Sequence, residues 1–428
     1  MMNPLRNGRL IASRFVSLLI NFLSIPLLLK YSGADILGSY YFLYGVFCLF
    51  SILDLGMGNA MIGLVSKEIY FDKKKVLSQG LFTLSIFSLL YITVFVILFA
   101  FQGTRIMGHI SFSEIDSFES AFILVCILGI LQNFGHMGLK YKSAIGRYNF
   151  TVYFETITVL SGITLTFFLL SFNSNILSLV IGMIGLPTLL SIVHLITLLN
   201  VSEPRNSIIS SVNGMKKSFF GLLVHGRLFF VLQITTVASL QIDSLVIGLF
   251  LGPNEVATTL ITWKLFSVPY VLFVSASGGL WAYASSKKNQ IDDLIFEGVF
   301  WKNIKYAFGY SLFFGFVIII FGQDLVLIFS QKLPTPSHLM LLISCILLIS
   351  LCVSQPISMI LNGLHREKFL ILTSLLGMIV NFLSSVFFLK IFDRGYGALL
   401  GTALAQIVCF IIPTLVAFLP WKKKGVGN

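Results

Sequence analysis

Charged residues are scarce in this chain of 428 residues: Asp, Glu, Lys and Arg make up only 11%, whereas hydrophobic residues make up 57%. A soluble globular domain carries about 25% charged residues. So few charges exclude a protein whose surface is mainly hydrated. The mean hydropathy of +0.94 indicates instead that most of the outer surface faces lipid.

The sequence also lacks the usual signatures of catalysis and of metal binding. It contains neither a Walker A motif nor an HExxH motif. The five cysteines form no CxxC pair and no Cys/His pattern typical of zinc. The most hydrophilic segments, 65–75, 200–217 and 285–297, are too short to fold as separate domains. We therefore predict a protein that is not an enzyme and that has neither a cofactor nor a metal site.

Long apolar runs fill most of the chain. A transmembrane helix needs about 20 mostly apolar residues, and breaks at charged residues, Pro, Gly and Asn divide the sequence into twelve such runs. Because the runs do not alternate in polarity, they are not strands of a membrane barrel. The prediction is an all-α polytopic membrane protein. The expected spans are 10–29, 36–64, 76–101, 118–142, 150–172, 176–199, 219–251, 255–284, 298–322, 335–362, 369–391 and 396–420.

The basic residues give the spans an orientation. With the N-terminus inside, five of the 29 Lys and Arg residues fall in outside loops and two within spans, which leaves 22 on the inside. Basic residues stay on the cytoplasmic side, so we expect both termini to be cytoplasmic. The net charge of +12 then reflects topology and contact with membrane lipids, not nucleic acid. The outside residues are Lys30, Arg105, Lys332, Lys390 and Arg394, and those within spans are Arg227 and Lys264.

Two short segments recur later in the chain at one constant spacing. After the first span Gly33 aligns with Gly252, and after the fourth span Arg147 aligns with Arg366. In both cases the two residues are 219 positions apart, and we call this distance the repeat offset. Six spans separate the copies, an even number, so both halves have the same orientation in the membrane. We predict two six-helix lobes related by a pseudo-twofold axis along the membrane normal, with a central cavity. The lobes comprise residues 1–205 and 206–428.

Three local motifs accompany this layout. They are LDLGMG at 53–58, GRYN at 146–149 and QIDSLVIG at 241–248. Together with the spacing of the spans, they resemble the MOP (multidrug/oligosaccharidyl-lipid/polysaccharide) exporter superfamily, and in particular its branch of Wzx-type O-antigen and polysaccharide flippases. The chain departs from that branch at 257–260, where Ala-Thr-Thr-Leu stands in place of a frequent Gly-x-Tyr.

The resemblance implies a MATE-like, two-lobed transporter that works by alternating access. Its implied substrate is an undecaprenyl-diphosphate-linked oligosaccharide, such as an O-antigen repeat unit for lipopolysaccharide, moved from the cytoplasmic to the periplasmic leaflet. The implied protein partners are a polysaccharide polymerase and a chain-length regulator. Without an ATPase motif, the energy is expected to come from an ion gradient, the membrane potential or trapping of the substrate.

Ionisable side chains inside a membrane are costly, which makes each one a candidate for function. Lys264 lies about ten residues into its span, close to the bilayer centre at about 1.5 Å per residue, and Ser267 and Ser275 share its face. An ammonium group there attracts a diphosphate or an acidic sugar. The alternative is an ion pair with a neighbouring helix.

Arg227, His225 and Arg14 complete the predicted substrate-binding set. His225 and Arg227 are two positions apart on a helix and therefore point in nearly opposite directions. Arg227 can alternatively extend its charge to the nearby cytoplasmic surface. For Arg14 the alternative is a structural ion pair near the inner end of the first span.

Three carboxylates, Glu155, Asp54 and Asp243, are predicted to take part in ion coupling or gating. A buried carboxylate can exchange a basic partner for a proton when its surroundings change, because burial and neighbouring charges shift its pKa. The alternative is that these groups form static pairs that stabilise the ends of the helices.

Two other functions stay open. A MATE-like antiporter of drugs or cations is expected to have an acidic cavity, whereas Lys264 places a basic group in the membrane. A membrane-embedded polysaccharide polymerase or ligase is expected to carry a long outside loop with catalytic residues, and no outside loop of this sequence is that long.

Overall fold

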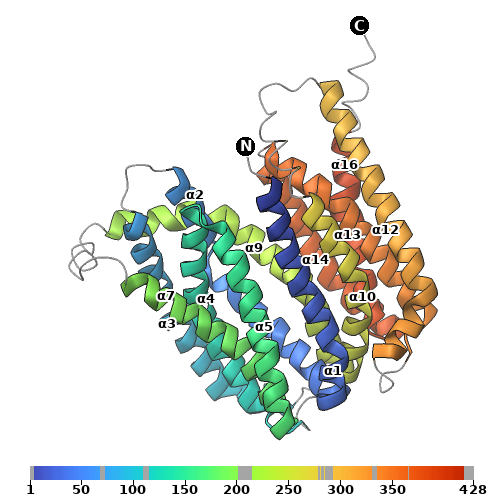
Figure 1. Cartoon of the computed structure of the whole chain (residues 1–428), viewed down its shortest axis with the longest axis horizontal. Coiled ribbons are helices and arrows are strands. Elements are labelled where there is room, and N and C mark those ends of the chain that lie inside the picture. Colours follow the sequence, from blue (N-terminus) through green and yellow to red (C-terminus); the bar gives the residue numbers. More distant parts are fainter. Residues whose placement is uncertain are drawn as a thin grey trace. The chain divides into compact units, whose positions relative to one another are not determined.

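The computed structural model describes residues 4–67, 73–108, 115–200, 215–277, 280, 284, 293–329, 335–364 and 366–418. Every regular element in these ranges is a helix (Figure 1), as the sequence predicts. The chain divides into two compact units, Met1–Val237 and Ala238–Asn428, which we call the first and the second lobe. The division falls inside one long helix, so that Met215–Val237, which the sequence analysis assigns to the second half, packs with the first lobe.

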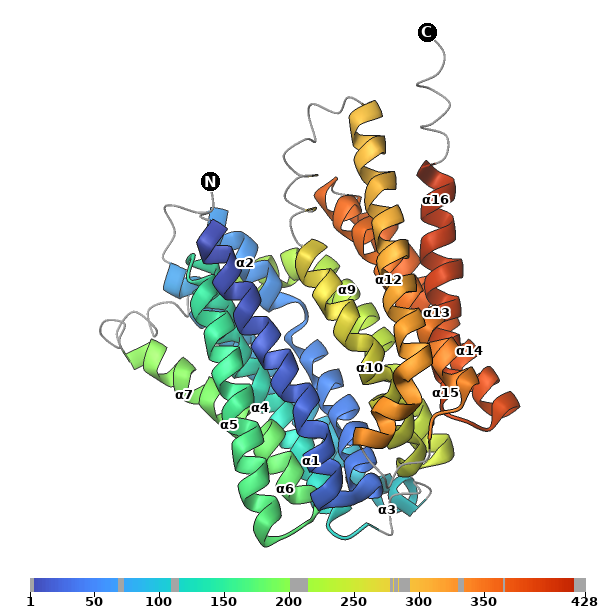
Figure 2. The same ribbon diagram turned by 45° about the vertical axis from the view of Figure 1, so that its right-hand side comes forward.

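The first lobe is a bundle in which α5 packs along both α1 and α4 (Figure 2). Helix α4 also contacts α2, α3 and α7 and is therefore the central helix of this lobe. Its elements are α1 (Pro4–Phe50), η1 (Ser51–Asp54), α2 (Met57–Lys67), α3 (Lys73–Gly108), α4 (Phe118–Ala144), α5 (Tyr148–Phe172), α6 (Ile176–Val180), the π-helical turn η2 (Ile181–Gly185), α7 (Leu186–Asn200) and the first part of α9 (Met215–Leu251).

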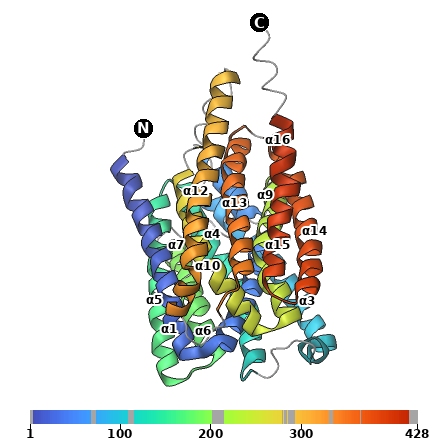
Figure 3. The ribbon, with the colours of Figure 1, turned by 90° about the vertical axis from the view of Figure 1, so that its right-hand side faces the viewer.

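In the second lobe α14 packs against α15, and α13 contacts α10, α12 and α15 (Figure 3). The sixth span of this lobe contains a π-helical turn, as the sixth span of the first lobe does. The elements are the rest of α9, α10 (Pro253–Ser277), α12 (Asp293–Phe329), α13 (His338–Gly363), α14 (Glu367–Phe392), α15 (Tyr396–Ala405), the π-helical turn η4 (Gln406–Ile411) and α16 (Ile412–Phe418).

Ten described helices are long and apolar enough to cross a membrane, and α9 adds an eleventh if its two bent parts, Phe229–Val237 and Gln241–Leu251, count as one span. The sequence predicts twelve. The difference lies in α1, which is continuous in hydrogen bonding but leaves the helical conformation at Gly33. Since α1 therefore holds two helical stretches, the eleven candidates correspond to the twelve predicted spans.

The two repeated segments have the same backbone conformations in both lobes. Gly33 has φ +82° and Gly252 has φ +84°, values that glycine adopts readily and that other residues avoid. Arg147 (φ −95°, ψ 40°) and Arg366 (φ −87°, ψ 41°) precede α5 and α14. Both turns therefore recur at the repeat offset, which supports the internal repeat.

Large apolar side chains lie on the outside of the bundles as well as in their cores. Phe172 is 76% exposed and Ile328 78% exposed, whereas the core of the first lobe includes Met57, Met61 and Met137 with at most 1% exposure. An outer surface this apolar is stable in lipid and not in water.

Candidate functional sites in the two lobes

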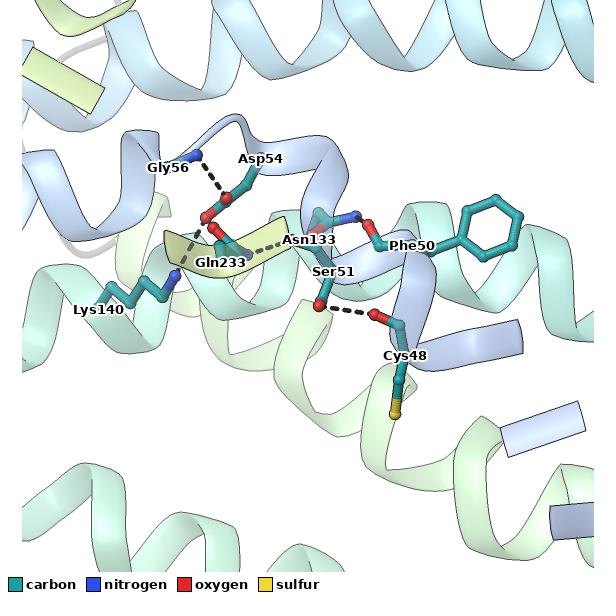
Figure 4. Close-up of polar contacts among 8 residues, drawn as sticks. All are labelled: Cys48, Phe50, Ser51, Asp54, Gly56, Asn133, Lys140 and Gln233. Atoms are coloured by element: carbon teal, nitrogen blue, oxygen red, sulfur yellow. Dashed lines mark hydrogen bonds and ion pairs between the residues drawn. The ribbon is translucent and has the colours of Figure 1, made fainter. Parts of the chain in front are cut away.

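The second predicted span is interrupted close to Asp54. Helix α1 ends at Phe50, the short turn η1 follows, and the chain then passes through Leu55 (φ 50°) and Gly56 (φ 73°) before α2 begins. Figure 4 shows the interruption and the polar side chains that surround it. Two consecutive residues with positive φ cannot continue an α-helix, so the LDLGMG motif encodes a break.

The backbone groups at the break are bonded by side chains from other helices. The amide nitrogen Nδ2 of Asn133 donates to the Phe50 carbonyl oxygen at 2.8 Å, and Nε2 of Gln233 on α9 donates to the Ser51 carbonyl oxygen (Figure 4). Within Asp54, Oδ1 accepts a hydrogen bond from the Gly56 amide at 2.9 Å. Non-helical backbone at membrane depth needs its polar groups satisfied within the protein, and these three hydrogen bonds satisfy part of that need.

Asp54 also forms an ion pair. Its Oδ2 lies 3.0 Å from Nζ of Lys140 on α4, and the two side chains are 7% and 26% exposed. Lys140 neutralises a carboxylate that would otherwise be very costly at this depth. The sequence analysis names Asp54 but counts Lys140 only as an inside residue. Lys140 lies one turn before the end of α4, and this position in the helix could have identified it from the sequence.

Glycine makes the break compact. A Cβ atom at Gly56 would lie 2.5 Å from both the Gly226 carbonyl oxygen and the Phe230 amide nitrogen of α9. A Cβ atom at Gly58 would collide with the side chain of Lys140. The glycines of the motif therefore let α9 and Lys140 approach the break directly.

The second lobe contains a different buried polar cluster. Oγ1 of Thr402 donates to Oδ1 of Asp243 at 2.7 Å and also lies 2.9 Å from Oδ1 of Asn381. Oγ of Ser385 lies 3.0 Å from the same amide oxygen and 3.1 Å from the Ala398 carbonyl oxygen. All four side chains are at most 7% exposed. In the described part of the chain Asp243 has no basic partner.

This oxygen cluster can accept a cation chemically. One carboxylate, one amide oxygen, two hydroxyls and a carbonyl oxygen are hard ligands, which suit a proton or a small hard cation and not a soft metal. A carboxylate without a basic partner is stable inside a membrane only if it binds such an ion or is protonated. The sequence analysis names Asp243 but misses Asn381, Ser385 and Thr402. Each of these three is a polar residue within an otherwise apolar run, and this feature could have identified it from the sequence.

Three of the other predicted residues have described side chains. Lys264 on α10 is half-buried, and the hydroxyl groups of Ser267 and Ser275 on its face donate to carbonyl oxygens of their own helix. Arg227 on α9 and Glu155 on α5 are exposed. Arg14 and His225 belong to α1 and α9, and their side chains lie outside the described part of the structure.

A second ionic contact joins α10 to the turn between α14 and α15. Nη1 of Arg394 lies 3.0 Å from Oε1 of Glu255, and Oε2 of Glu255 accepts the Gly395 amide at 3.0 Å. The hydrogen bond with Glu255 and the charge of that residue raise the pKa of Arg394 above its ordinary value. Arg394 is 64% exposed, so this contact has a structural role at the rim of the lobe.

Comparisons with known proteins agree with this architecture. The family model described as MatE matches residues 229–387. The structure of a multidrug resistance MATE family transporter of the MOP superfamily, in an inward-facing conformation, superposes with a TM-score of 0.70 at 14% identity and covers 96% of each chain. No curated protein matches the sequence.

Two further solved structures have the same arrangement of helices. The lipid II flippase MurJ matches with a TM-score of 0.66 at 18% identity, over 95% of this chain and 87% of MurJ. The Vibrio cholerae MATE transporter VcmN, as its D35N mutant, matches with a TM-score of 0.57 at 12% identity, over 98% and 96% of the two chains. The chain therefore has the fold that MATE transporters and the flippase MurJ share.

Proposed function

We propose that this protein is a transporter of the MOP superfamily and, within it, a flippase. It moves an undecaprenyl-diphosphate-linked oligosaccharide from the cytoplasmic to the periplasmic leaflet of a bacterial inner membrane, with both termini in the cytoplasm. The observation that carries the proposal is the fold shared with MurJ over 95% of this chain. The motifs that resemble polysaccharide flippases favour a glycan substrate.

The substrate carries a diphosphate, and the proposal assigns its binding to basic residues. Lys264 is half-buried on α10, at a depth where an ammonium group attracts an anion strongly. Arg227, exposed on α9, is the second group, and Arg14 and His225 complete the set. An arginine can bind a phosphate through two parallel N–H groups, and a lysine binds it as a compact point charge.

Ion coupling is assigned to Asp243. Binding of a proton or a sodium ion to the oxygen cluster around Asp243 neutralises the carboxylate, and this free energy can favour one conformation of the transporter. Asp54 is already neutralised by Lys140 at 3.0 Å, so we assign it to gating at the interrupted span. Glu155, exposed on α5, is a further candidate for gating.

A MATE-like antiporter is the second candidate. The match of the MatE family model to residues 229–387 and the fold shared with a multidrug transporter favour it. In that case the same Asp243 cluster serves coupling, but the exported compound is a drug or a cation and no glycan is carried.

Deletion of the gene in its own host separates the two candidates. For a flippase we expect surface polysaccharide to disappear while single repeat units accumulate on undecaprenyl diphosphate, as measured by mass spectrometry of extracted lipids. Restoration by the wild-type gene and not by a Lys264→Glu variant would connect the phenotype to the basic group. Normal polysaccharide with increased drug sensitivity would contradict the flippase and support the antiporter.

After translocation, the repeat unit passes to a polysaccharide polymerase and a chain-length regulator, which are the proposed protein partners. Cross-linking of the tagged protein in its host, followed by mass spectrometry, tests these partners. Recovery of neither one above the level of an unrelated polytopic membrane protein would contradict the assignment.

A further inference from the structure

Two basic side chains lie together where α4 ends and α5 begins. Lys142 is in the last turn of α4, and Arg147 is the exposed residue that precedes α5. The Arg147 amide donates to the Lys142 carbonyl oxygen, which brings the two basic residues together. Within the described part of the chain, neither Lys142 nor Arg147 has a carboxylate partner. Among the described residues, no carboxylate therefore compensates this concentration of positive charge.

An aromatic surface lies directly beside these charges. The ring of His194 packs against Phe150 and Phe154, with centroid distances of 4.9 and 5.3 Å, and the two phenylalanines stack on each other at 5.8 Å. Nζ of Lys142 lies 5.7 Å from the centroid of Phe150, so the ammonium group is held over the ring. The aromatic rings therefore fix the position of the positive charge.

The backbone of this corner is rigidly bonded. The Arg147 amide donates to the Lys142 carbonyl oxygen at 2.9 Å, and Oγ of Ser143 lies 3.0 Å from Oγ1 of Thr151. Arg147 makes no side-chain hydrogen bond that caps α5, so the positive end of this long helix is open beside the two basic groups. The corner combines two cations and a helix N-terminus, all of which attract an anion.

The same surface is apolar toward the membrane. Tyr148 is 46% exposed, Phe150 and Tyr153 are each 40% exposed, and Ile157, two turns into α5, is 61% exposed. Exposed tyrosines at the end of a span are typical of the membrane–water interface. A molecule that fits both parts has an anionic head at Lys142 and Arg147 and acyl chains along α5.

We propose that the corner formed by Lys142, Arg147, Phe150 and His194 binds the headgroup of an anionic phospholipid of the cytoplasmic leaflet. The phosphate lies between the two cations, and the acyl chains follow the exposed face of α5. Basic groups between helices at the cytoplasmic side are a recurring form of lipid recognition. This site is independent of the transport function proposed above.

The second lobe provides an internal control, because it repeats the turn without the equivalents of Lys142 and His194. At the repeat offset Arg366 corresponds to Arg147, but Leu361 corresponds to Lys142 and Pro413 to His194. Arg366 is followed by the acidic Glu367 and then by the basic Lys368, which stands where the first lobe has Asn149. The backbone conformations are the same, so only the first lobe is expected to select an anionic lipid at this turn.

The test measures lipid retention by the full chain. The purified protein is titrated with phosphatidylglycerol or phosphatidylcholine, and bound lipid is counted by native mass spectrometry at low and high salt. We expect phosphatidylglycerol to bind more tightly, and Lys142→Ala and Arg147→Ala each to weaken its binding about fivefold, the effect of one basic group at a membrane surface. The double variant should lose about 25-fold, and high salt should reduce the wild-type preference.

Matched variants keep the outcome interpretable. Lys142→Arg should retain the preference, and Arg366→Ala should leave it unchanged; both variants keep the fold of the corner. Equal binding of the two lipids by the wild type would overturn the proposal, as would an equal loss in Arg366→Ala. Inorganic phosphate that competes at concentrations similar to those of the lipid would also overturn it, because the site would then recognise an ion and not a lipid.

Discussion

The two lobes share their turns and differ in their charges. Gly33 and Gly252 have φ values within two degrees of each other, and Arg147 and Arg366 start α5 and α14 in the same conformation. The ion pair of the first lobe, however, is not repeated. At the repeat offset Phe273 corresponds to Asp54 and Met359 to Lys140.

The oxygen cluster of the second lobe is equally unrepeated. Ser24 corresponds to Asp243, Gly162 to Asn381 and Thr166 to Ser385. The hydroxyl groups of Ser24 and Thr166 simply donate to carbonyl oxygens of their own helices. Among the described residues, the two lobes thus share the conformation of their turns, while each has a buried carboxylate of its own, Asp54 and Asp243.

The two charged groups also differ in their chemistry. Asp54 is paired with Lys140 and bonded to the Gly56 amide, so its charge is compensated by the protein. Asp243 contacts neutral oxygens and a hydroxyl donor. A compensated pair resists change, whereas an uncompensated carboxylate takes up an ion. We therefore expect the second lobe to sense the ion gradient and the first lobe to provide the gate.

The largest effect is expected when Asp243, the buried carboxylate of the second lobe, is replaced. Asp243→Asn removes the charged oxygen of the cluster but keeps its size, and should reduce gradient-dependent export between about 5-fold and about 150-fold, the usual range of a coupling free energy. Export of the glycan can be followed in cells or in oriented vesicles with an imposed proton or sodium gradient. Ser24→Ala at the corresponding position of the first lobe is the matched control. Unchanged export by Asp243→Asn would remove the cluster from the mechanism.

A methyl group at the interrupted span should destabilise the first lobe. Gly56→Ala combines a positive φ of 73° with a Cβ atom 2.5 Å from two backbone atoms of α9, and we expect a cost of about 3 kcal/mol. Gly146→Ala has a similar φ of 85° but no atom within 4 Å, so its cost should be about 1 kcal/mol. The midpoint of thermal unfolding in detergent measures both. Equal shifts for the two variants would mean that the close approach of α9 contributes nothing.

The ion pair of the first lobe should show strong coupling. Lys140→Met leaves the Asp54 carboxylate buried without its partner, and because Lys140 is a quarter exposed we expect a cost of about 2 kcal/mol, less than for a fully buried pair. Asp54→Asn in the same chain should recover much of this loss, since Asn still accepts from the Gly56 amide. The four thermal midpoints form a double-mutant cycle. Additive effects of the two substitutions would contradict the pairing.

The smallest effect is expected at the start of the sixth span of each lobe. In the first lobe Asn175 caps α6 by accepting the Ser178 amide at 2.9 Å, and Asn175→Ala should cost about 1 kcal/mol. In the second lobe Glu255 accepts the Gly395 amide instead. Glu255→Gln keeps an acceptor oxygen and loses only an exposed ion pair. Its thermal midpoint should therefore shift less than that of Asn175→Ala. This small shift should vanish in high salt, because salt screens the ion pair. A larger, salt-independent shift would show that Glu255 has another role.

Sequence reasoning located the charged groups but not their partners. Asp54 and Asp243 stand out because carboxylates are rare in apolar runs. Lys140, Asn381 and Thr402 were not selected, although each lies on a span predicted within a few residues of its observed bounds. The depth of a residue along a helix and its face can be read from the sequence, whereas the rotation of one helix against another is set by side-chain packing throughout the bundle.

The sequence by itself determined that the chain is an all-helical membrane protein, where its spans lie and where its duplicated turns occur, because hydrophobic length and glycine conformation are local properties. Only the tertiary structure decided that Asp54 meets Lys140 at an interrupted span, that Asp243 meets Thr402, and that Lys142 lies over the ring of Phe150, which packs against His194. These contacts join residues 86 and 159 positions apart for the two carboxylates, and their partners are selected by the packing of whole helices.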